Sequence, residues 1–254
     1  MSRADVRSTA LVTGATSGIG RAAALALADR GWWVVATGRD TDRGAQVADA
    51  LRRRNAGTFL ACDLTDAGAA EALVAEVVSV GNGLGALVNN AGVHFLDTTE
   101  TTAPDDYARL MDLNVRAAFD LCRAAIPVLR AGGGGVIVNV ASEAGLVAVP
   151  GQAAYNMSKA ALIMLTRSLA ADHARDGIRA VSVCPGTTRT PLVEQAIAGA
   201  DDPPAHERAL ADTRPARRLG TVDEIAAAIT FCCSDDVAFM TGSELVIDGG
   251  YTAV

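Results

Sequence analysis

Short apolar runs alternate with longer amphipathic stretches along most of the chain. The runs predict strands over 9–13, 33–37, 58–62, 86–89, 136–140, 180–184 and 244–247. The stretches between them predict helices over 21–30, 42–54, 66–80, 104–130 and 224–233, and one that contains Tyr155 and ends near 176. This alternation is typical of βαβ units, whose parallel strands need helical crossovers on both faces. The pattern therefore predicts an α/β fold with one doubly wound parallel sheet of seven strands.

A chain of 254 residues is long enough for one large α/β domain, and no repeat or low-complexity linker divides it. We therefore expect a single domain over 1–254. The least regular segment, 187–219, is polar and contains prolines. Such a segment is typical of a lid over a site. A tolerated surface insertion is the alternative interpretation.

Composition and charge limit the classes of partner that this protein is expected to bind. The net charge is −7, and the one marked basic run, Arg52 to Arg54, falls at a predicted helix end. Neither nucleic acid nor an anionic membrane surface is therefore expected as a partner. No apolar signal region precedes the first strand and no run approaches a membrane span. The five cysteines and three histidines show no metal-ligand spacing. We expect a cytoplasmic protein without a metal site.

One cation stands apart from the others. Of the 22 lysines and arginines, only Lys159 is a lysine, and it lies four residues after Tyr155. Residues i and i+4 share a helix face. At about 4 Å and an effective dielectric near 20, an ammonium attracts a phenolate by roughly 4 kcal/mol, enough to lower the phenol pKa toward neutrality. A phenol tuned in this way can act as a general acid or base. A chance pairing is the alternative.

A glycine-rich turn joins the first strand to the first helix. Gly14, Gly18 and Gly20 recur within eight residues of Thr13. Glycines let a backbone turn tightly and approach a ligand, and a helix N-terminus attracts a pyrophosphate. In this position the turn predicts a Rossmann-type dinucleotide site.

The spacing G-x-x-x-G-x-G resembles that of the short-chain dehydrogenase/reductase family, and the resemblance extends over almost the whole chain. The matching motifs are Thr13 to Gly20, Asn89-Asn90-Ala91-Gly92, Asn114, Ser142, Tyr155-x-x-x-Lys159, Pro185-Gly186 with Thr190, and Asp248-Gly249-Gly250. The resemblance implies an enzyme that transfers a hydride between a nicotinamide and a carbonyl carbon. It says little about the substrate.

The resemblance also implies roles for individual residues. Tyr155 would donate or accept the proton, Ser142 would hold the substrate oxygen, Lys159 would lower the tyrosine pKa and bind the nicotinamide ribose, and Asn114 would hold a water linked to Lys159. The cofactor would contact Gly14, Thr16, Ser17, Gly18, Ile19, Gly20, Arg39, Asp63, Leu64, Asn90, Ala91, Gly92, Tyr155, Lys159, Pro185, Gly186 and Thr190.

The end of the second strand bears on the choice of cofactor. An acid there binds the ribose 2′-hydroxyl of NAD, whereas an arginine accommodates the 2′-phosphate of NADP. Here Gly38 occupies the acid position and Arg39 follows it. We therefore predict NADP(H), with NAD(H) possible because Asp40 could turn toward a ribose. Asp63 and Leu64 resemble the adenine-contacting pair of the family, although Asp63 could instead cap the next turn.

Residues next to these motifs are candidates for the substrate pocket. They are His94, Glu143, Val149, Gln152, Leu192 and Gln195, together with Ser142 and Tyr155. Their mixed polarity favours a small or medium polar ketone or alcohol. Arginines 189, 208, 214, 217 and 218 could receive a carboxylate or carrier phosphate, or could be solvated charges paired with Asp201, Asp202 and Glu207.

Other functions stay open at this point. A 3-oxoacyl-carrier-protein reductase and an NAD-dependent sugar-acid or polyol dehydrogenase both fit the resemblance. Divergent enoyl reductases space the tyrosine and lysine more widely, and extended epimerases have an additional C-terminal substrate domain. A non-catalytic dinucleotide-sensing protein would be free to lose Ser142, Tyr155 or Lys159, all of which are present.

The helices from Pro104 and Tyr155 carry small-residue faces suited to pairing, and we expect a homotetramer.

Overall fold

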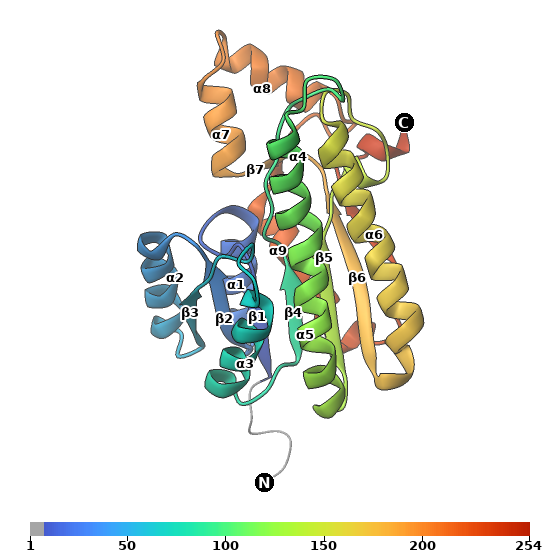
Figure 1. Ribbon diagram of the computed structural model, residues 1–254. Helices are drawn as coiled ribbons and strands as arrows, with labels where there is room; N and C mark the ends of the chain where they lie inside the picture. The colour runs from blue at the N-terminus through green and yellow to red at the C-terminus, as the bar shows by residue number, and fades with distance from the viewer. Residues whose placement is uncertain (1–7) are drawn as a thin grey trace.

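The computed structural model describes residues 8–254 (Figure 1). Seven strands form one sheet in the order β3-β2-β1-β4-β5-β6-β9, and every neighbouring pair is parallel. Their bounds are β1 Thr9–Val12, β2 Trp33–Gly38, β3 Gly57–Ala61, β4 Ala86–Asn89, β5 Gly135–Val140, β6 Ile178–Pro185 and β9 Glu244–Ile247. The predicted doubly wound parallel sheet is confirmed.

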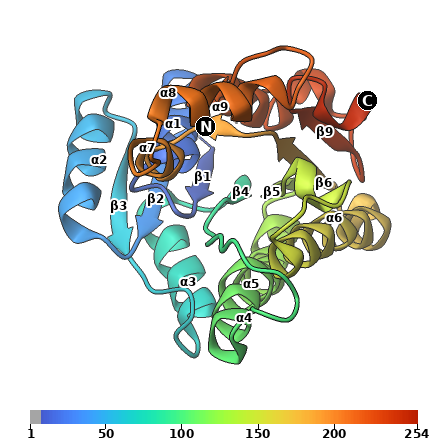
Figure 2. The same cartoon turned by 90° about the horizontal axis from the view of Figure 1, so that it is seen from above.

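Helices cover both faces of this sheet (Figure 2). On one face lie α1 Gly18–Asp29, α2 Thr41–Arg53 and α9 Val222–Cys232, and on the other α3 Ala69–Gly81, α5 Ala117–Ala131 and α6 Ala153–His173. Strand β1 shows why both faces are apolar: Ala10 and Val12 pack into the first layer and Leu11 into the second. Successive side chains of a strand point to opposite faces, so a strand covered twice reads as a continuous apolar run.

The predicted helix over 104–130 is not uniform. It consists of α4 Pro104–Met111, a π-helical turn over Asp112–Arg116 and α5. The chain continues in helical conformation through the turn, and Asn114 in its middle is buried. A π-turn inserts one extra residue into a helix and often marks a functional position. Hydrophobic periodicity does not reveal such an insertion, because it shifts the pattern by only one residue.

The segment 187–219, expected to be irregular, contains two short helices, α7 Pro191–Ala198 and α8 Pro203–Asp212. The side chains of Thr190 and Asp202 cap their N-termini, and each helix begins with a proline. They stand above the carboxyl ends of the central strands (Figure 1). Only Ile197 of α7 is buried and no residue of α8 is, so the apolar pattern that identifies a helix is weak here. Next to them, β7 Thr188–Arg189 pairs with β8 Gly220–Thr221.

A buried polar ladder fixes α6 to the sheet. Asn89, Asn139 and Ser182 lie abreast on β4, β5 and β6. The Asn89 amide donates to the Asn139 carbonyl oxygen at 2.9 Å, and Asn139 donates to the Thr166 hydroxyl of α6 at 2.8 Å. The Ser182 hydroxyl bonds to the same Thr166 oxygen at 2.8 Å. Buried polar networks of this kind fix one arrangement of the elements that they join. The ladder therefore fixes the position of α6, the helix that carries Tyr155, relative to the sheet.

Candidate active site

A cleft of about 470 Å³ opens at the carboxyl ends of β1, β2 and β4. It is lined by Gly14, Thr16, Ser17, Gly18, Ile19, Gly38, Arg39, Asp40, Arg43, Cys62, Asp63, Leu64, Asn90, Ala91, Gly92, Val93, Leu113, Thr190, Pro191 and Leu192. Doubly wound sheets bind ligands at the carboxyl ends of their strands, at the point where the order of the strands along the chain reverses. In this sheet that point lies between β1 and β4. Twelve of the seventeen predicted cofactor residues line the cleft; Gly20, Tyr155, Lys159, Pro185 and Gly186 do not.

The glycine turn has the shape of a phosphate cradle. Gly14 and Gly18 have φ values of +61° and +52°, which favour glycine. A Cβ on Gly14 would lie 2.9 Å from Ala91 Cα, and one on Gly20 would lie 2.4 Å from the Asn90 amide nitrogen. Ser17 precedes α1 without a side-chain cap, so the first amides of the helix are free to bind a ligand. These residues fit a dinucleotide pyrophosphate.

The second asparagine of the N-N-A-G motif holds this cradle in place. The Asn90 amide donates to the carbonyls of Thr13 and Gly14, at 3.0 and 3.3 Å. In return, the Thr13 hydroxyl accepts from the backbone amides of Asn90 and Ala91, each at 3.0 Å. The glycine turn and the loop after β4 are therefore one unit. Gly20, although outside the cleft, is needed because the Asn90 side chain occupies the space of its Cβ.

At the other end of the cleft, charged side chains surround the position expected for the adenosine ribose. A Cβ on Gly38 would lie 2.8 Å from the Thr16 methyl group, so an acidic side chain there would displace Thr16. Asp40 caps α2 by accepting from the Arg43 amide at 2.9 Å and pairs with the Arg43 guanidinium. Arg39 lies 3.4 Å from Asp63 and is half exposed.

Asp63 binds the turn that follows it, as one of its two anticipated roles requires, and also lines the cleft. One oxygen accepts from the Thr65 amide and hydroxyl at 3.0 and 2.7 Å, which lowers the pKa of Asp63. The other oxygen faces Arg39, and the residue also lines the cleft.

Tyr155, Ser142 and Lys159 come together from two elements. Ser142 lies just beyond the end of β5, and its side chain hydrogen-bonds to Tyr155 in the first turns of α6. The Lys159 nitrogen lies 5.5 Å from the centre of the Tyr155 ring and donates to the Val140 carbonyl at 2.9 Å. A Cβ on Gly92, which lines the cleft, would lie 3.8 Å from the same nitrogen. The cluster therefore borders the dinucleotide cleft.

The pKa of the tyrosine differs from the expectation. Burial raises the pKa of Tyr155 to about 12; the hydrogen bond to Ser142 lowers it, and the Glu143 charge raises it further. Burial also lowers the pKa of Lys159 to about 8. Burial of the phenol therefore outweighs the lowering of the tyrosine pKa that was expected from Lys159.

Asn114 anchors the loop beside Gly92. Its amide oxygen accepts from the Val93 amide at 2.8 Å, and its nitrogen donates to the Val93 carbonyl at 2.9 Å and to the Ser158 hydroxyl at 3.1 Å. Both amide protons are thus used within the protein. A water held by this residue would have to bind through an acceptor oxygen. The side chain itself positions the wall of the cleft.

Some of the predicted pocket residues lie beside Tyr155 or line the cleft, and the others lie elsewhere. His94 packs its ring edge-on against Tyr155, with centroids 4.6 Å apart, and its Nε2 bonds to the Gln152 amide oxygen. Leu192 lines the cleft and is 58% exposed. The Val149 carbonyl accepts from Asn156, and Gln195 is exposed on α7. His94 therefore lies against Tyr155 with Gln152 bonded to it, and Leu192 lines the neighbouring cleft.

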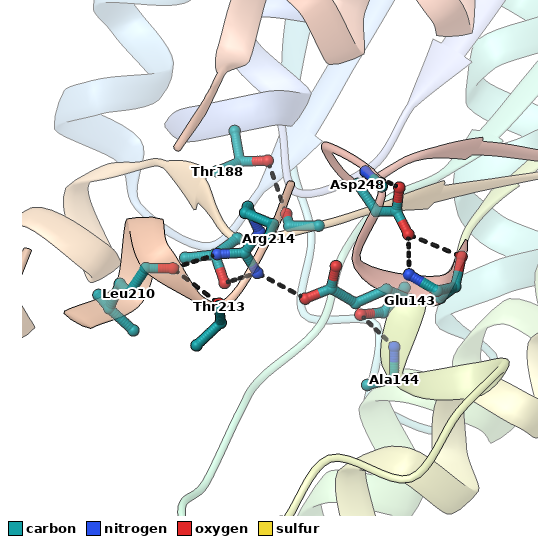
Figure 3. Close-up of polar contacts among 12 residues, drawn as sticks. Glu143, Ala144, Thr188, Leu210, Thr213, Arg214 and Asp248 are labelled. Carbon is teal, nitrogen blue, oxygen red and sulfur yellow. Dashed lines mark hydrogen bonds and ion pairs between the residues drawn. The ribbon is translucent and has the colours of Figure 1, made fainter. Parts of the chain in front are cut away.

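Glu143 does not lie open to this space as expected. It is 6% exposed, and its carboxylate forms an ion pair with Arg214 at 2.9 Å (Figure 3). Burial raises the pKa of Glu143 to about 7, although Arg214 opposes the rise. The reason for the difference is the 187–219 segment, which brings Arg214 back over the loop after Ser142.

The remaining arginines of that segment are mostly paired at the surface. Arg189 bonds to Glu207, Arg217 lies 3.4 Å from Asp212 and Arg218 lies 2.6 Å from Glu224. The expected pairing with Glu207 is confirmed, whereas Asp202 instead caps α8. Arg214 is the exception, since it is buried.

Sequence reasoning missed several residues of the site. Arg43, Leu113 and Val93 line the cleft, and Thr13 ties the glycine turn to Asn90. Arg43 follows Asp40 by three residues at a helix start, a spacing that could have indicated its position beside Arg39.

No helix among residues 8–254 has the length and apolar character to span a membrane. In the same part of the chain no group of three metal-ligating side chains forms.

Comparisons with known proteins agree with this geometry. The family model described as enoyl-(acyl carrier protein) reductase matches residues 14–252. The chain is 37% identical to 2-(R)-hydroxypropyl-CoM dehydrogenase of Xanthobacter autotrophicus over 96% of this chain and 98% of that protein. It is also 37% identical to cyclopentanol dehydrogenase of a Comamonas species, over 96% of each.

A solved structure extends the comparison. L-sorbose reductase of Gluconobacter frateurii, in complex with NADPH and L-sorbose, superposes with a TM-score of 0.92 at 30% identity, over 98% of each chain. The fold, the glycine cradle and the tyrosine cluster, together with these likenesses, place the chain in the short-chain dehydrogenase/reductase family of oxidoreductases.

Proposed function

We propose that the protein is an NADP-dependent oxidoreductase that interconverts a ketone and a secondary alcohol, with Tyr155 as the general acid and base. The observation that carries the proposal is the convergence of the Ser142 hydroxyl and the Lys159 ammonium on the Tyr155 ring beside the cleft. The cyclopentanol and hydroxypropyl-CoM dehydrogenases among its relatives act on alcohols by name.

The residues of the chain divide the chemistry between them. When bound, the nicotinamide supplies or accepts the hydride, and the protein must supply position and a proton. The Ser142 hydroxyl, already bonded to Tyr155, would hold the substrate oxygen beside the phenol. In reduction the Tyr155 hydroxyl gives its proton to that oxygen; in oxidation the phenolate takes it.

Lys159 has two tasks in this proposal. Its ammonium, fixed at Val140, keeps a positive charge 5.5 Å from the Tyr155 ring and favours the phenolate against the cost of burial. It would also hold the nicotinamide ribose, since Gly92 of the cleft lies beside it. Asn114 fixes the loop from Gly92 to Val93, so that this wall of the cleft keeps its distance from Lys159.

NADP(H) is the proposed cofactor, for three reasons at the ribose end of the cleft. No acid occupies position 38, and Thr16 fills the space of a side chain there. Arg39 and Arg43 both line the cleft and are half exposed, so their guanidiniums are free to turn to a phosphate. Asp40, the acid that could serve NAD, is committed to capping α2. L-sorbose reductase was solved with NADPH.

The proposed substrate is a small or medium uncharged polar ketone or alcohol. His94 and Gln152 supply polar atoms next to Tyr155, while Leu192 adds an apolar wall. The four-residue spacing of Tyr155 and Lys159 favours carbonyl chemistry over enoyl reduction.

Three broader proposals accompany this function. The chain acts as one domain over 1–254, in which 187–219 forms a lid over the cleft. It works as a homotetramer in the cytoplasm. Sedimentation of the purified protein tests the assembly, since a monomer or dimer at assay concentration would contradict the tetramer.

A screen tests the function directly. Purified protein is assayed with NADPH and NADH against cyclic ketones, hydroxyketones and keto-sugars, and with the oxidised cofactors against the matching alcohols. The proposal expects turnover of an uncharged ketone or alcohol with a higher kcat/KM for NADPH than for NADH. Tight NADPH binding without turnover of any compound would instead indicate a dinucleotide-sensing protein.

A further inference from the structure

One buried cation lies outside the catalytic cluster. Arg214 is 4% exposed and makes polar contacts with three segments. Its guanidinium donates to the Leu210 carbonyl at the end of α8 at 2.6 Å, to the Thr187 hydroxyl at 2.9 Å and to the Glu143 carboxylate at 2.9 Å. Its guanidinium carbon also lies 5.5 Å from the centre of the Tyr251 ring. Figure 3 shows Glu143 between Arg214 on one side and Asp248 on the other.

The lid segment, 187–219, is attached near its ends by the β7–β8 pair and the Arg218–Glu224 ion pair, but its two helices bury few side chains. Helix α8 buries no residue, and α7 buries only Ile197. After α8, the chain packs on the C-terminal loop: a Cβ on Gly250 would lie 3.0 Å from Pro215, and the Ala216 amide donates to the Gly249 carbonyl at 2.9 Å. Arg214 lies at the centre of this attachment. The position of α8 therefore depends on a few contacts around one guanidinium.

Glu143 connects this attachment to the reacting groups. It follows Ser142 directly, in a turn that Ser142 caps by accepting from the Ala144 amide at 3.1 Å. One carboxylate oxygen bonds to Arg214. The other is buried without a hydrogen-bond partner and lies 2.6 Å from where a Cβ on Gly186 would be. Glu143 is thus in contact with the lid and with the Pro185-Gly186 loop, and covalently next to the serine.

We propose that the Glu143–Arg214 ion pair is a positioning device that couples the lid to Ser142. With Arg214 in place, α8, the Thr187 loop and the turn after Ser142 hold one arrangement. A displacement of the lid is then transmitted to the serine hydroxyl that orients the substrate oxygen. The inference rests on the proposed function, because it gives Ser142 that task.

The ion pair between Glu143 and Arg214 also determines the net charge next to Tyr155. The charged and titratable groups around Glu143 are Arg214, Asp248 and Tyr155, and the carboxylate of Glu143 already raises the pKa of Tyr155. Arg214 neutralises the carboxylate and is itself neutralised by it. A buried arginine in this state is not free to receive an anionic substrate. Removing it leaves the Glu143 carboxyl without its cation one residue from the serine. Because burial already raises the pKa of this carboxyl to about 7 against the opposing effect of Arg214, its loss favours the neutral acid.

Three variants separate coupling from simple loss of packing. Arg214→Met removes the cation but keeps an unbranched side chain, Glu143→Gln removes the anion, and the double variant Glu143→Gln/Arg214→Met removes both. Arg54→Met is the control, because Arg54 joins α1 to α2 through Asp29 at 2.7 Å and is not among the residues that line the cleft. Each is measured for kcat, KM, NADPH affinity and the pH midpoint of alcohol oxidation, and for hydrogen exchange of 203–219 without ligand.

Arg214→Met is expected to lower kcat at least about tenfold, since a small misplacement near the chemistry costs that much. NADPH affinity should change little. The double variant should recover part of kcat, because the buried carboxyl that lost its partner is gone. Exchange over 203–219 should increase in both variants that lack Arg214, and the control should match the wild type.

Other results overturn the proposal. It fails if Arg214→Met keeps the wild-type kcat and exchange, or if the double variant is as impaired as Arg214→Met in kcat. Should Arg214→Met not fold, Glu143→Gln decides: the pair predicts a midpoint moved to lower pH, and an unmoved midpoint contradicts it. If the wild type turns over no alcohol or ketone, the proposed function fails, and the exchange of 203–219 alone decides whether Arg214 holds the lid.

Discussion

The ammonium of Lys159 lies 5.5 Å from the centre of the Tyr155 ring. It donates to the Val140 carbonyl at 2.9 Å. A positive charge in this position attracts a phenolate. That attraction does not overcome the burial that raises the pKa of Tyr155 to about 12. A fully basic Tyr155 therefore needs a further positive charge or hydrogen bond in the ternary complex.

The burial of Lys159 predicts a stability effect with a defined sign. Its pKa falls from 10.5 to about 8 on folding, so between these values the unfolded chain holds a proton that the folded chain has lost. Stability from this group therefore rises with pH across that window, and below pH 8 the cost of burying the ammonium is present in full.

Lys159→Met should accordingly be more stable than the wild type at pH 7, by on the order of 2 kcal/mol after loss of the Val140 hydrogen bond. The difference should shrink between pH 8 and 10. Urea unfolding at pH 7 and 10 measures it. A variant that is less stable than the wild type at pH 7 would show that the ammonium stabilises the fold. Turnover should be nearly abolished in the same variant.

The ribose end of the cleft predicts the cofactor preference. Arg39→Gln and Arg43→Gln each remove a charged donor that lines the cleft. Each should lower kcat/KM for NADPH by about tenfold, as expected for a charge-assisted hydrogen bond, and leave that for NADH within about twofold. Initial rates with both cofactors measure the ratio. A parallel loss for NADH and NADPH would mean that the arginines do not contact the 2′-phosphate.

The position of His94 predicts that this residue contributes to binding of the ketone substrate but not to binding of the cofactor. It packs on Tyr155 and bonds to Gln152, but it is not among the residues that line the dinucleotide cleft. His94→Ala should raise KM for the ketone about tenfold, the value of one well-placed polar contact, with NADPH affinity unchanged. Leu96→Ala, in the same loop and 73% exposed, is the control. An unchanged KM, or a loss of NADPH affinity, would argue against a substrate contact.

Much of this arrangement follows from sequence. Apolar runs and their spacing predicted the seven parallel strands, because strands covered on both faces are continuously apolar. The glycine turn predicted the cradle, since its backbone has conformations that only glycine adopts readily. Arg39, the loop after β4 and Thr190 all line the cleft as predicted.

The rest depended on tertiary contacts that leave no local pattern. The π-turn at Asn114 shifts the helix by one residue and keeps its amphipathic character. Arg214 is one of several arginines in a polar segment, and nothing in its neighbours distinguishes it from Arg217 or Arg218. Only the folded chain brings it to Glu143, 71 residues earlier in sequence. The direction of the Tyr155 pKa depended on burial, which a motif does not report.

The most direct test of the central claim is single-turnover reduction by Tyr155→Phe with saturating NADPH and the best ketone from the screen. The ring and its packing remain, while the proton that the hydroxyl would donate is gone. The account predicts NADPH affinity within about twofold of the wild type and a rate of hydride transfer lower by at least about a hundredfold, the contribution of a positioned general acid. A variant that reduces the ketone at the wild-type rate would contradict it.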